Sequence, residues 1–226
     1  MLASLRGLCF LACLTPCTVI LGTLSLLDRR HHHMYTRLWG RIGLFLSRTR
    51  VIVEGAEQLP SAASIVIANH ASGFDILTLV GYFPRPLTWV AKESLFHIPI
   101  FGHALRSGGH IPMNRTQYRD AHHALDAAYK RLTAGANVLV FPEGTRTTDG
   151  HLLPFKRGAF VLAHQAKVPI VPLSIDGSFA VNPGGTFHLT CGKTVVLRIH
   201  QSTYMTDGSR AEIETIRQTI AQGVHP

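Results

Sequence analysis

The feature that most constrains this chain is an unbroken apolar stretch near its N-terminus. Residues 7–27, GLCFLACLTPCTVILGTLSLL, carry no charged side chain. As a helix rising about 1.5 Å per residue they would extend roughly 31 Å, which matches the hydrocarbon core of a bilayer. The run is longer than that of a cleaved secretory signal, and Leu26, Leu27 and Asp28 at its end do not resemble a cleavage site. We therefore expect a retained membrane segment, of the transmembrane-helix type.

Two details of this segment leave its geometry open. Pro16 near its middle would kink a helix, so a shallow or re-entrant helix packed against a second apolar stretch at 38–46 is an alternative to a full span. Six arginines follow the segment, whereas Arg6 and the terminal amine precede it. The positive-inside tendency therefore places the rest of the chain on the cytoplasmic side, which we expect to be that of a bacterial inner membrane. The six are Arg29, Arg30, Arg37, Arg41, Arg48 and Arg50.

The composition agrees with a lipid environment. Charged residues make up only 15% of the chain and hydrophobic residues 46%, so part of the apolar surface must face something other than water. Lysine and arginine outnumber acidic residues by 22 to 13, a net charge of +9 that favours partners carrying phosphate, such as nucleic acid, anionic membrane lipid or phosphorylated substrates. No nucleic-acid-binding module is recognisable, so we expect no nucleic-acid partner. No pair of the four cysteines has zinc-ligand spacing, and no metal site is expected.

Beyond residue 49 short β-branched runs alternate with longer amphipathic ones, which predicts an α/β domain over 50–226 behind a helical membrane segment over 1–49. The clearest helix is 117–133, with Thr116 as a possible N-cap and Gly135 placed to end it. The expected strands are 50–54, 64–68, 87–91, 110–113, 137–141, 168–175 and 194–200.

The last predicted helix begins with Ser209, and Glu212 follows three residues later. This spacing is a capping box, in which each side chain bonds the backbone N–H of the other residue. We therefore expect both reciprocal bonds at the start of the C-terminal helix.

The sharpest local signal is NHASGFD, directly after the apolar run 64–68. A histidine at the end of a strand lies where α/β proteins usually keep their sites. Asp75 could orient His70 as a general base, but only if His70 precedes the helix and the turn curls back, which Ser72 and Gly73 permit. The alternative is that Ser72 and Asp75 only cap the helix. No serine or cysteine lies in a nucleophile-elbow pattern, so direct attack by a substrate hydroxyl fits better than a covalent intermediate.

The second constellation is FPEGTR, again at the end of an apolar strand. Glu143 could accept a hydrogen bond from a glycerol hydroxyl, Gly144 allows a sharp turn, Thr145 could donate to an oxyanion, and Arg146 offers a planar fork for phosphate. The alternative is a solvated turn with an internal pair between Glu143 and Arg146. Further basic residues near strand ends could complete a phosphate pocket. They are Lys92, Arg115, Lys156 and Arg157.

Taken together, NHASGFD, GGHIPMNR, FPEGTR and VPIVPLSI resemble, in order and spacing, the four motifs of the glycerolipid acyltransferase family, over roughly 50–200. The resemblance implies a single mixed-sheet domain of that type, and transfer of a fatty acyl group to the free hydroxyl of lysophosphatidate, forming phosphatidate in phospholipid biosynthesis. It implies acyl-CoA or acyl-carrier protein as co-substrate, and no further cofactor.

The resemblance also implies roles for single residues. His70 would be the catalytic base and Asp75 its orienting partner. Substrate binding would fall to Lys92, Arg115, Glu143, Gly144, Thr145 and Arg146. The second motif departs from the family pattern, because Asn114 stands where an aspartate is common. Relatives acylate lysophosphatidylcholine, glycerol 3-phosphate or lyso-ornithine lipid with the same His and Asp, and these acceptors remain alternatives. So does a noncatalytic protein that binds anionic lipid.

Overall fold

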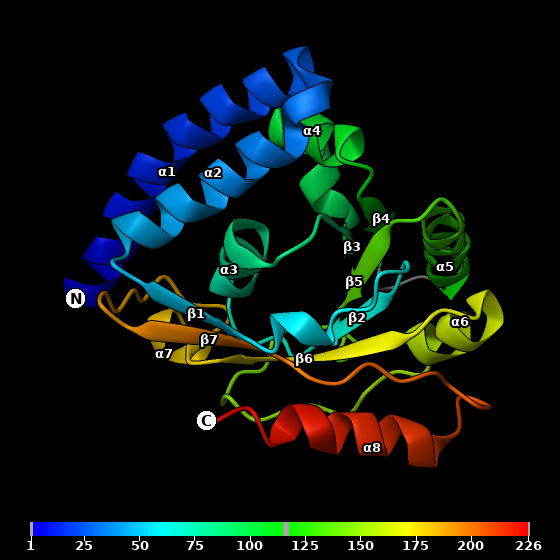
Figure 1. The fold of residues 1–226 in the computed structure, drawn as a ribbon. Coiled ribbons are helices and arrows are strands. Elements are labelled where there is room, and N and C mark those ends of the chain that lie inside the picture. The colour runs from blue at the N-terminus through cyan, green and yellow to red at the C-terminus, as the bar shows by residue number, and fades with distance from the viewer. Residues whose placement is uncertain (1, 115–117, 226) are drawn as a thin grey trace.

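The strands form one mixed sheet. Within residues 2–114 and 118–225, which the computed structural model describes, seven strands are ordered β1-β7-β6-β2-β5-β3-β4 (Figure 1). They are parallel except at the β6–β7 pair, so β1 and β7 run against the other five. The strands are β1 (Arg50–Glu54), β2 (Ile65–Ala68), β3 (Leu87–Lys92), β4 (Ile111–Met113), β5 (Asn137–Val140), β6 (Ile170–Asp176) and β7 (Thr194–Ile199).

The order of the central strands decides where the site forms. The neighbours β2, β5 and β3 are parallel, so their carboxyl ends share one edge of the sheet. His70 follows β2, Phe141 follows β5, and Lys92 ends β3. Three segments that are far apart in the sequence therefore meet at this edge, where open α/β sheets generally bind ligands.

Helices cover both faces of the sheet (Figure 1). Along β2, Val66 and Ala68 pack into a cluster with the helices α1 to α4, whereas Ile65 and Ile67 pack into a second cluster with α5, α6 and α8. Successive strand residues face opposite sides, so a strand buried on both faces is a continuous apolar run. The helices are α1 (Leu2–Leu27), α2 (His32–Leu46), α3 (Phe74–Tyr82), α4 (Phe101–Ser107), α5 (Tyr118–Thr133), α6 (Gly158–Ala166), α7 (Ser178–Val181) and α8 (Arg210–Ala221).

The N-terminal segment is a pair of helices that packs on the α/β part. In the described chain α1 is the one helix long and apolar enough to cross a membrane by length and composition, and it continues through Pro16. It packs along α2 (Figure 1). Between the two helices the Trp39 indole N–H donates to the Thr18 hydroxyl at 2.8 Å. Packing of the apolar helix against the stretch 38–46 is thus confirmed. Many large apolar side chains of α1 stay exposed, including Leu5 and Leu8 at 56% each.

Two of the arginines behind the apolar stretch have structural partners. Arg37 donates to the Phe83 carbonyl at 2.7 Å and Arg41 to the Gly81 carbonyl at 3.1 Å. Both carbonyls lie at the C-terminal end of α3, where cations satisfy unpaired carbonyls and oppose the helix dipole. These arginines fix α2 to the helix that carries Asp75.

Most expected elements are present, with boundaries that differ by one or two residues. The strand expected over 168–175 runs from Ile170 to Asp176, and α5 begins at Tyr118. Thr116, the expected cap of α5, lies outside the described residues, as does Arg115.

The capping box at α8 is only half formed. Ser209 accepts from the Glu212 N–H at 3.4 Å, but the Glu212 carboxylate accepts from the amides of Thr206 and Gly208 instead of the Ser209 amide. The prediction of a reciprocal bond is wrong, because the loop before the helix places its own amide donors within reach of the Glu212 carboxylate. These amides, that of Thr206 first, lower the pKa of Glu212 to about 2.

Candidate active site

His70 and Asp75 form a hydrogen-bonded pair at the carboxyl end of β2. The distance from His70 Nδ1 to the Asp75 carboxylate is 2.7 Å. The pair forms because His70 precedes α3 and the chain curls back over residues 71–73, as the spacing required. The Asp75 side chain is fully buried, whereas 12% of the His70 side chain is exposed. With Nδ1–H directed at the carboxylate, Nε2 of a neutral imidazole carries the lone pair that a general base needs.

Asp75 also organises the turn that precedes its helix. The same oxygen, Oδ2, accepts from the backbone amides of Ala71 at 2.8 Å and Ser72 at 2.9 Å. The Ser72 hydroxyl accepts from the Phe74 amide at 3.1 Å. One carboxylate therefore both pairs with His70 and accepts from the backbone amides before α3, whereas catalysis by the pair stays a prediction.

The His70 ring is held from the side as well. It stacks on Phe141, the first residue of the FPEGTR segment, with ring centroids 4.0 Å apart and planes 16° apart. Phe141 received no role from the sequence, because stacking between residues 71 positions apart leaves no mark on local spacing. A ring fixed by a carboxylate at one nitrogen and by an aromatic face has little freedom to lose on binding substrate.

The Glu143 carboxylate connects the turn after β2 with the loop after β5 through hydrogen bonds. One carboxylate oxygen accepts from the His70 amide at 2.7 Å, and the other accepts from the Leu153 amide at 2.8 Å. Glu143 is buried, and this burial raises the pKa of its carboxyl group, although the two amides partly oppose the shift. Arg146 is not among the ion-pair partners recorded for the described residues. The Glu143 carboxylate thus positions the backbone of His70, and the substrate-binding role expected from the sequence stays a prediction.

We expect Glu143→Gln to lower the free energy of unfolding by about 1–3 kcal/mol. A carboxamide accepts through one oxygen only, so either the His70 or the Leu153 amide would face an NH₂ group. Urea denaturation measures the change. The matched control is Glu214→Gln, whose carboxylate pairs with Arg217 on the surface and should change stability by less than about 0.5 kcal/mol. Unchanged stability with a raised KM for the lipid acceptor would instead favour substrate binding by Glu143.

Cationic side chains gather beside the dyad. Lys92 and Arg146 both line the same cavity as His70. The Lys156 amine lies over Gly144, where a Cβ atom would come within 2.6 Å of it, and Gly144 has a φ of +75° that favours glycine. Thr145 is exposed and is not among the cavity-lining residues. The cavity thus brings together basic residues from at least two strand ends, and their binding of phosphate stays a prediction.

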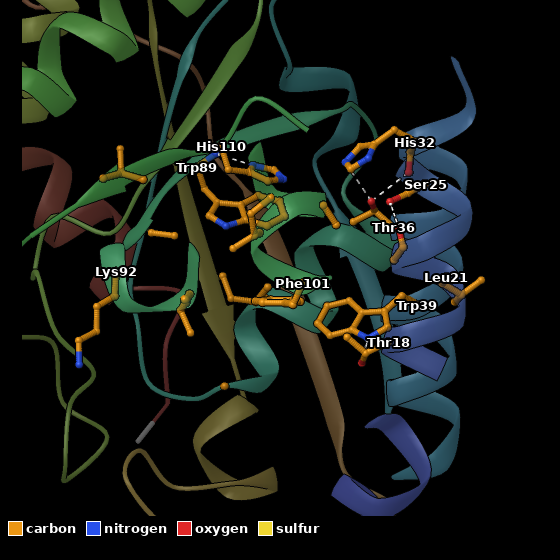
Figure 2. Close-up of a pocket in the computed structure, with 18 of the residues that line it drawn as sticks. Thr18, Leu21, Ser25, His32, Thr36, Trp39, Trp89, Lys92, Phe101 and His110 are labelled. Atoms are coloured by element: carbon orange, nitrogen blue, oxygen red, sulfur yellow. Dashed lines mark hydrogen bonds between the residues drawn. The ribbon is translucent and has the colours of Figure 1, made fainter. Parts of the chain in front are cut away.

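The cavity that His70 faces is long and mostly apolar. Its volume is about 400 Å³, and it runs from the carboxyl edge of the sheet into the space between α1, α2 and α4. Figure 2 shows Lys92 on one side of it, and Ser25, His32 and Thr36 on the other. Trp39 and Phe101 form part of its wall, with ring centroids 6.1 Å apart. Sequence reasoning missed this cavity, because the residues of α1 and α2 meet β3 and α4 only in three dimensions.

One wall of the cavity contains a buried histidine, His110, whose contacts stabilise the fold. His110 stacks on Trp89 with centroids 3.5 Å apart and accepts from the Trp89 amide at 3.3 Å. Burial lowers the pKa of His110 to about 3, so its imidazole is neutral at physiological pH. Among the described residues, no group of three or more His, Cys, Asp or Glu side chains could hold a metal ion.

Comparison with known proteins agrees with this arrangement. A family model described as Acyltransferase matches residues 50–176, a range that holds both His70 and Glu143. The chain belongs to the acyltransferase family. This acyltransferase-family chain is 30% identical over 236 residues to a chloroplastic 1-acyl-sn-glycerol-3-phosphate acyltransferase of Brassica napus, covering 98% of this chain and 67% of that protein. It is 41% identical over 131 residues to the human 1-acyl-sn-glycerol-3-phosphate acyltransferase alpha, covering 57% of this chain and 46% of that protein.

A solved structure extends the similarity to the whole acyltransferase chain. The crystal structure of the 1-acyl-sn-glycerophosphate acyltransferase PlsC from Thermotoga maritima is similar with a TM-score of 0.84 and 29% sequence identity, and covers 98% of this chain and 94% of that chain. The expected α/β domain with a single mixed sheet and an N-terminal apolar helix is confirmed. The acyltransferase chain spans between 54% and 67% of the first three curated relatives.

Proposed function

We propose that this chain transfers a fatty acyl group from an acyl-CoA or acyl-carrier-protein thioester to the free hydroxyl of lysophosphatidate, giving phosphatidate and a free thiol. The observation that carries the proposal is the 2.7 Å bond between His70 and Asp75 at the mouth of an apolar cavity with Lys92 and Arg146 beside it. The names of the similar proteins support lysophosphatidate as the acceptor.

The chemistry requires one proton to move twice. His70 Nε2 removes the proton from the acceptor hydroxyl while the hydroxyl oxygen attacks the thioester carbonyl. The buried Asp75 carboxylate stabilises the imidazolium that forms. When the C–S bond breaks, the imidazolium returns the proton to the departing thiolate. No enzyme nucleophile enters this sequence, which agrees with the lack of a nucleophile-elbow motif in the chain.

The surroundings of the dyad offer one region for the phosphate of the acceptor and another for the acyl chain of the donor. Lys92 and Arg146 supply the positive charge that a dianionic acceptor headgroup needs, because one phosphate calls for several cationic or hydrogen-bonding partners. The aromatic and aliphatic walls behind His70 suit the acyl chain of the donor, since a cavity of about 400 Å³ lies within the range of small-ligand sites.

The exposed face of α1 would lie in lipid on the cytoplasmic side of the membrane. Apart from Arg6 near its N-terminus, its exposed large side chains are apolar, which a soluble surface of this size rarely shows. This arrangement brings the cavity next to the bilayer, from which the lysophosphatidate acceptor would come.

The experiment that tests the activity is acyl transfer from radiolabelled acyl-CoA, and in parallel from acyl-carrier protein, to a panel of lysolipids in detergent micelles. Formation of phosphatidate from lysophosphatidate is the expected result. Transfer only to lysophosphatidylcholine or lyso-ornithine lipid would keep the chemistry and replace the acceptor. Binding of anionic lipid without any transfer would favour the noncatalytic alternative.

We expect Ala104→Phe to shift donor preference toward shorter acyl chains. Ala104 on α4 lines the cavity, and a benzyl group there would occupy space that a long chain needs. The ratio of kcat/KM for a long-chain to a short-chain acyl-CoA should fall on the order of tenfold, which corresponds to about 1.4 kcal/mol. The exposed His103 beside it provides a control, since His103→Phe should leave the ratio unchanged. An equal loss for all chain lengths would place the acyl chain elsewhere.

A further inference from the structure

The loop between α7 and β7 reaches the N-terminal helix at one end. The Leu189 amide donates to the Ala3 carbonyl at 3.1 Å. The Phe187 carbonyl packs so closely on α1 that a Cβ atom at Gly7 would collide with it. Figure 1 shows this loop beside the N-terminal end of α1, at the edge of the sheet that holds β1 and β7. The loop therefore lies against the segment that carries the exposed apolar face.

The other end of the same loop touches the active-site turns. The Ser72 hydroxyl donates to the Asn182 carbonyl at 2.7 Å. Gly184 packs against the second turn, where a Cβ atom would lie 2.8 Å from the Thr147 carbonyl oxygen and 3.1 Å from Arg146 Cβ. Residues 182–189 thus form a continuous bridge from α1 to the two turns that hold His70 and Arg146.

Hydrogen bonds within residues 182–189 stabilise the loop, and the loop exposes the aromatic side chain of Phe187. The Asn182 amide group donates to the carbonyls of Thr186 at 3.1 Å and His188 at 2.6 Å. Leu189 is buried, with only 3% of its surface exposed, whereas Phe187 is 64% exposed. Phe187 therefore projects from a loop whose backbone packs on the N-terminal turns of α1, the turns that also carry the exposed Leu5 and Leu8.

We propose that residues 182–189 form a second membrane contact, in which Phe187 enters the same lipid surface as α1. The proposal rests on the proposed function only in that α1 meets lipid. The partner is a bilayer surface, because the apolar residues of α1 continue onto the loop and the loop carries no acidic side chain that an anionic leaflet would repel. Through Asn182 and Gly184, this contact fixes the active-site turns against the leaflet that presents the acceptor headgroup.

The test compares Phe187→Ser with Tyr204→Ser. Tyr204 is also 64% exposed, but its neighbour Met205 packs into the cluster on the opposite face of the sheet. In sedimentation with vesicles of phosphatidylcholine and phosphatidylglycerol, Phe187→Ser should partition on the order of tenfold more weakly than the wild type, and Tyr204→Ser like the wild type. Transfer to lysophosphatidate in vesicles should fall in parallel, whereas transfer to a short-chain monomeric lysophosphatidate should not.

A third variant separates this inference from the proposed function. Leu8→Asp should weaken partitioning if α1 meets lipid, since Leu8 is 56% exposed on that helix. Weak partitioning of Leu8→Asp with unchanged partitioning of Phe187→Ser would overturn the loop contact and keep the membrane role of α1. Unchanged partitioning of both would overturn both. Phe187→Trp gives an independent test by fluorescence, because brominated lipid should quench the emission of the added tryptophan. Quenching no greater than in the wild type would also overturn the loop contact.

Discussion

His70→Ala is expected to lower kcat for acyl transfer to lysophosphatidate by a factor of about 10²–10⁴. The substitution removes the only imidazole in the described chain that combines a 2.7 Å bond to a buried carboxylate with a place on the cavity wall beside Lys92. It leaves the Ala71 and Ser72 amides bonded to Asp75, so the turn should keep its shape. Vesicle binding and the unfolding midpoint should therefore stay close to those of the wild type.

The control for this prediction is another histidine. His103 is exposed on α4 and does not line the cavity, so His103→Ala should change kcat by less than about twofold. Steady-state transfer from acyl-CoA, with both variants at saturating acceptor, gives the comparison. Wild-type rates in His70→Ala would remove general-base catalysis by His70 from the mechanism.

The second large effect is expected for Asp75→Asn, which should reduce kcat by about 10²–10⁴. An asparagine can place its oxygen where Asp75 Oδ2 lies, and so keep the bonds from His70 and from the Ala71 and Ser72 amides. The second carboxylate oxygen has no hydrogen-bond partner among the described residues, so the NH₂ group would take a site without an acceptor. What the variant loses is the negative charge that stabilises the imidazolium.

Asp75→Ala then provides the contrast. It would leave the Ala71 and Ser72 amides without their acceptor and should lower the free energy of unfolding by about 1–3 kcal/mol in addition to lowering kcat. Rates and urea unfolding curves of the two variants separate charge from turn structure. If Asp75→Asn retained full activity, Asp75 would serve only as a helix cap.

Local sequence pattern predicted the strands and permitted the dyad beside the capping alternative, because both depend on short-range rules. Apolar runs such as 64–68 and 137–141 are buried on both faces of the sheet, and this burial is what made them recognisable. The five-residue spacing between His70 and Asp75, with small residues between them, allowed the turn that the structure contains. The apolar helix was equally evident, because its length and composition are local properties.

The hydrogen-bond partners of Glu143 could not be predicted from the sequence. Its partners are the amides of His70 and Leu153, and their approach depends on β2 and β5 being neighbours. A carboxylate next to glycine and arginine has the same local pattern whether it binds substrate or backbone. Only the order of the strands decided which donors lie within hydrogen-bonding distance.

The sequence by itself determined that this chain has an apolar N-terminal helix, an α/β domain and a histidine with an acid five residues later. These are properties of hydrophobic period and close spacing, which act over a few residues. The tertiary structure alone decided the cavity between α1, α2 and α4, the stacking of Phe141 on His70, and the bridge from Ala3 to Ser72 through residues 182–189. Each joins segments that are distant in the chain, and such contacts depend on how layers pack rather than on any local preference.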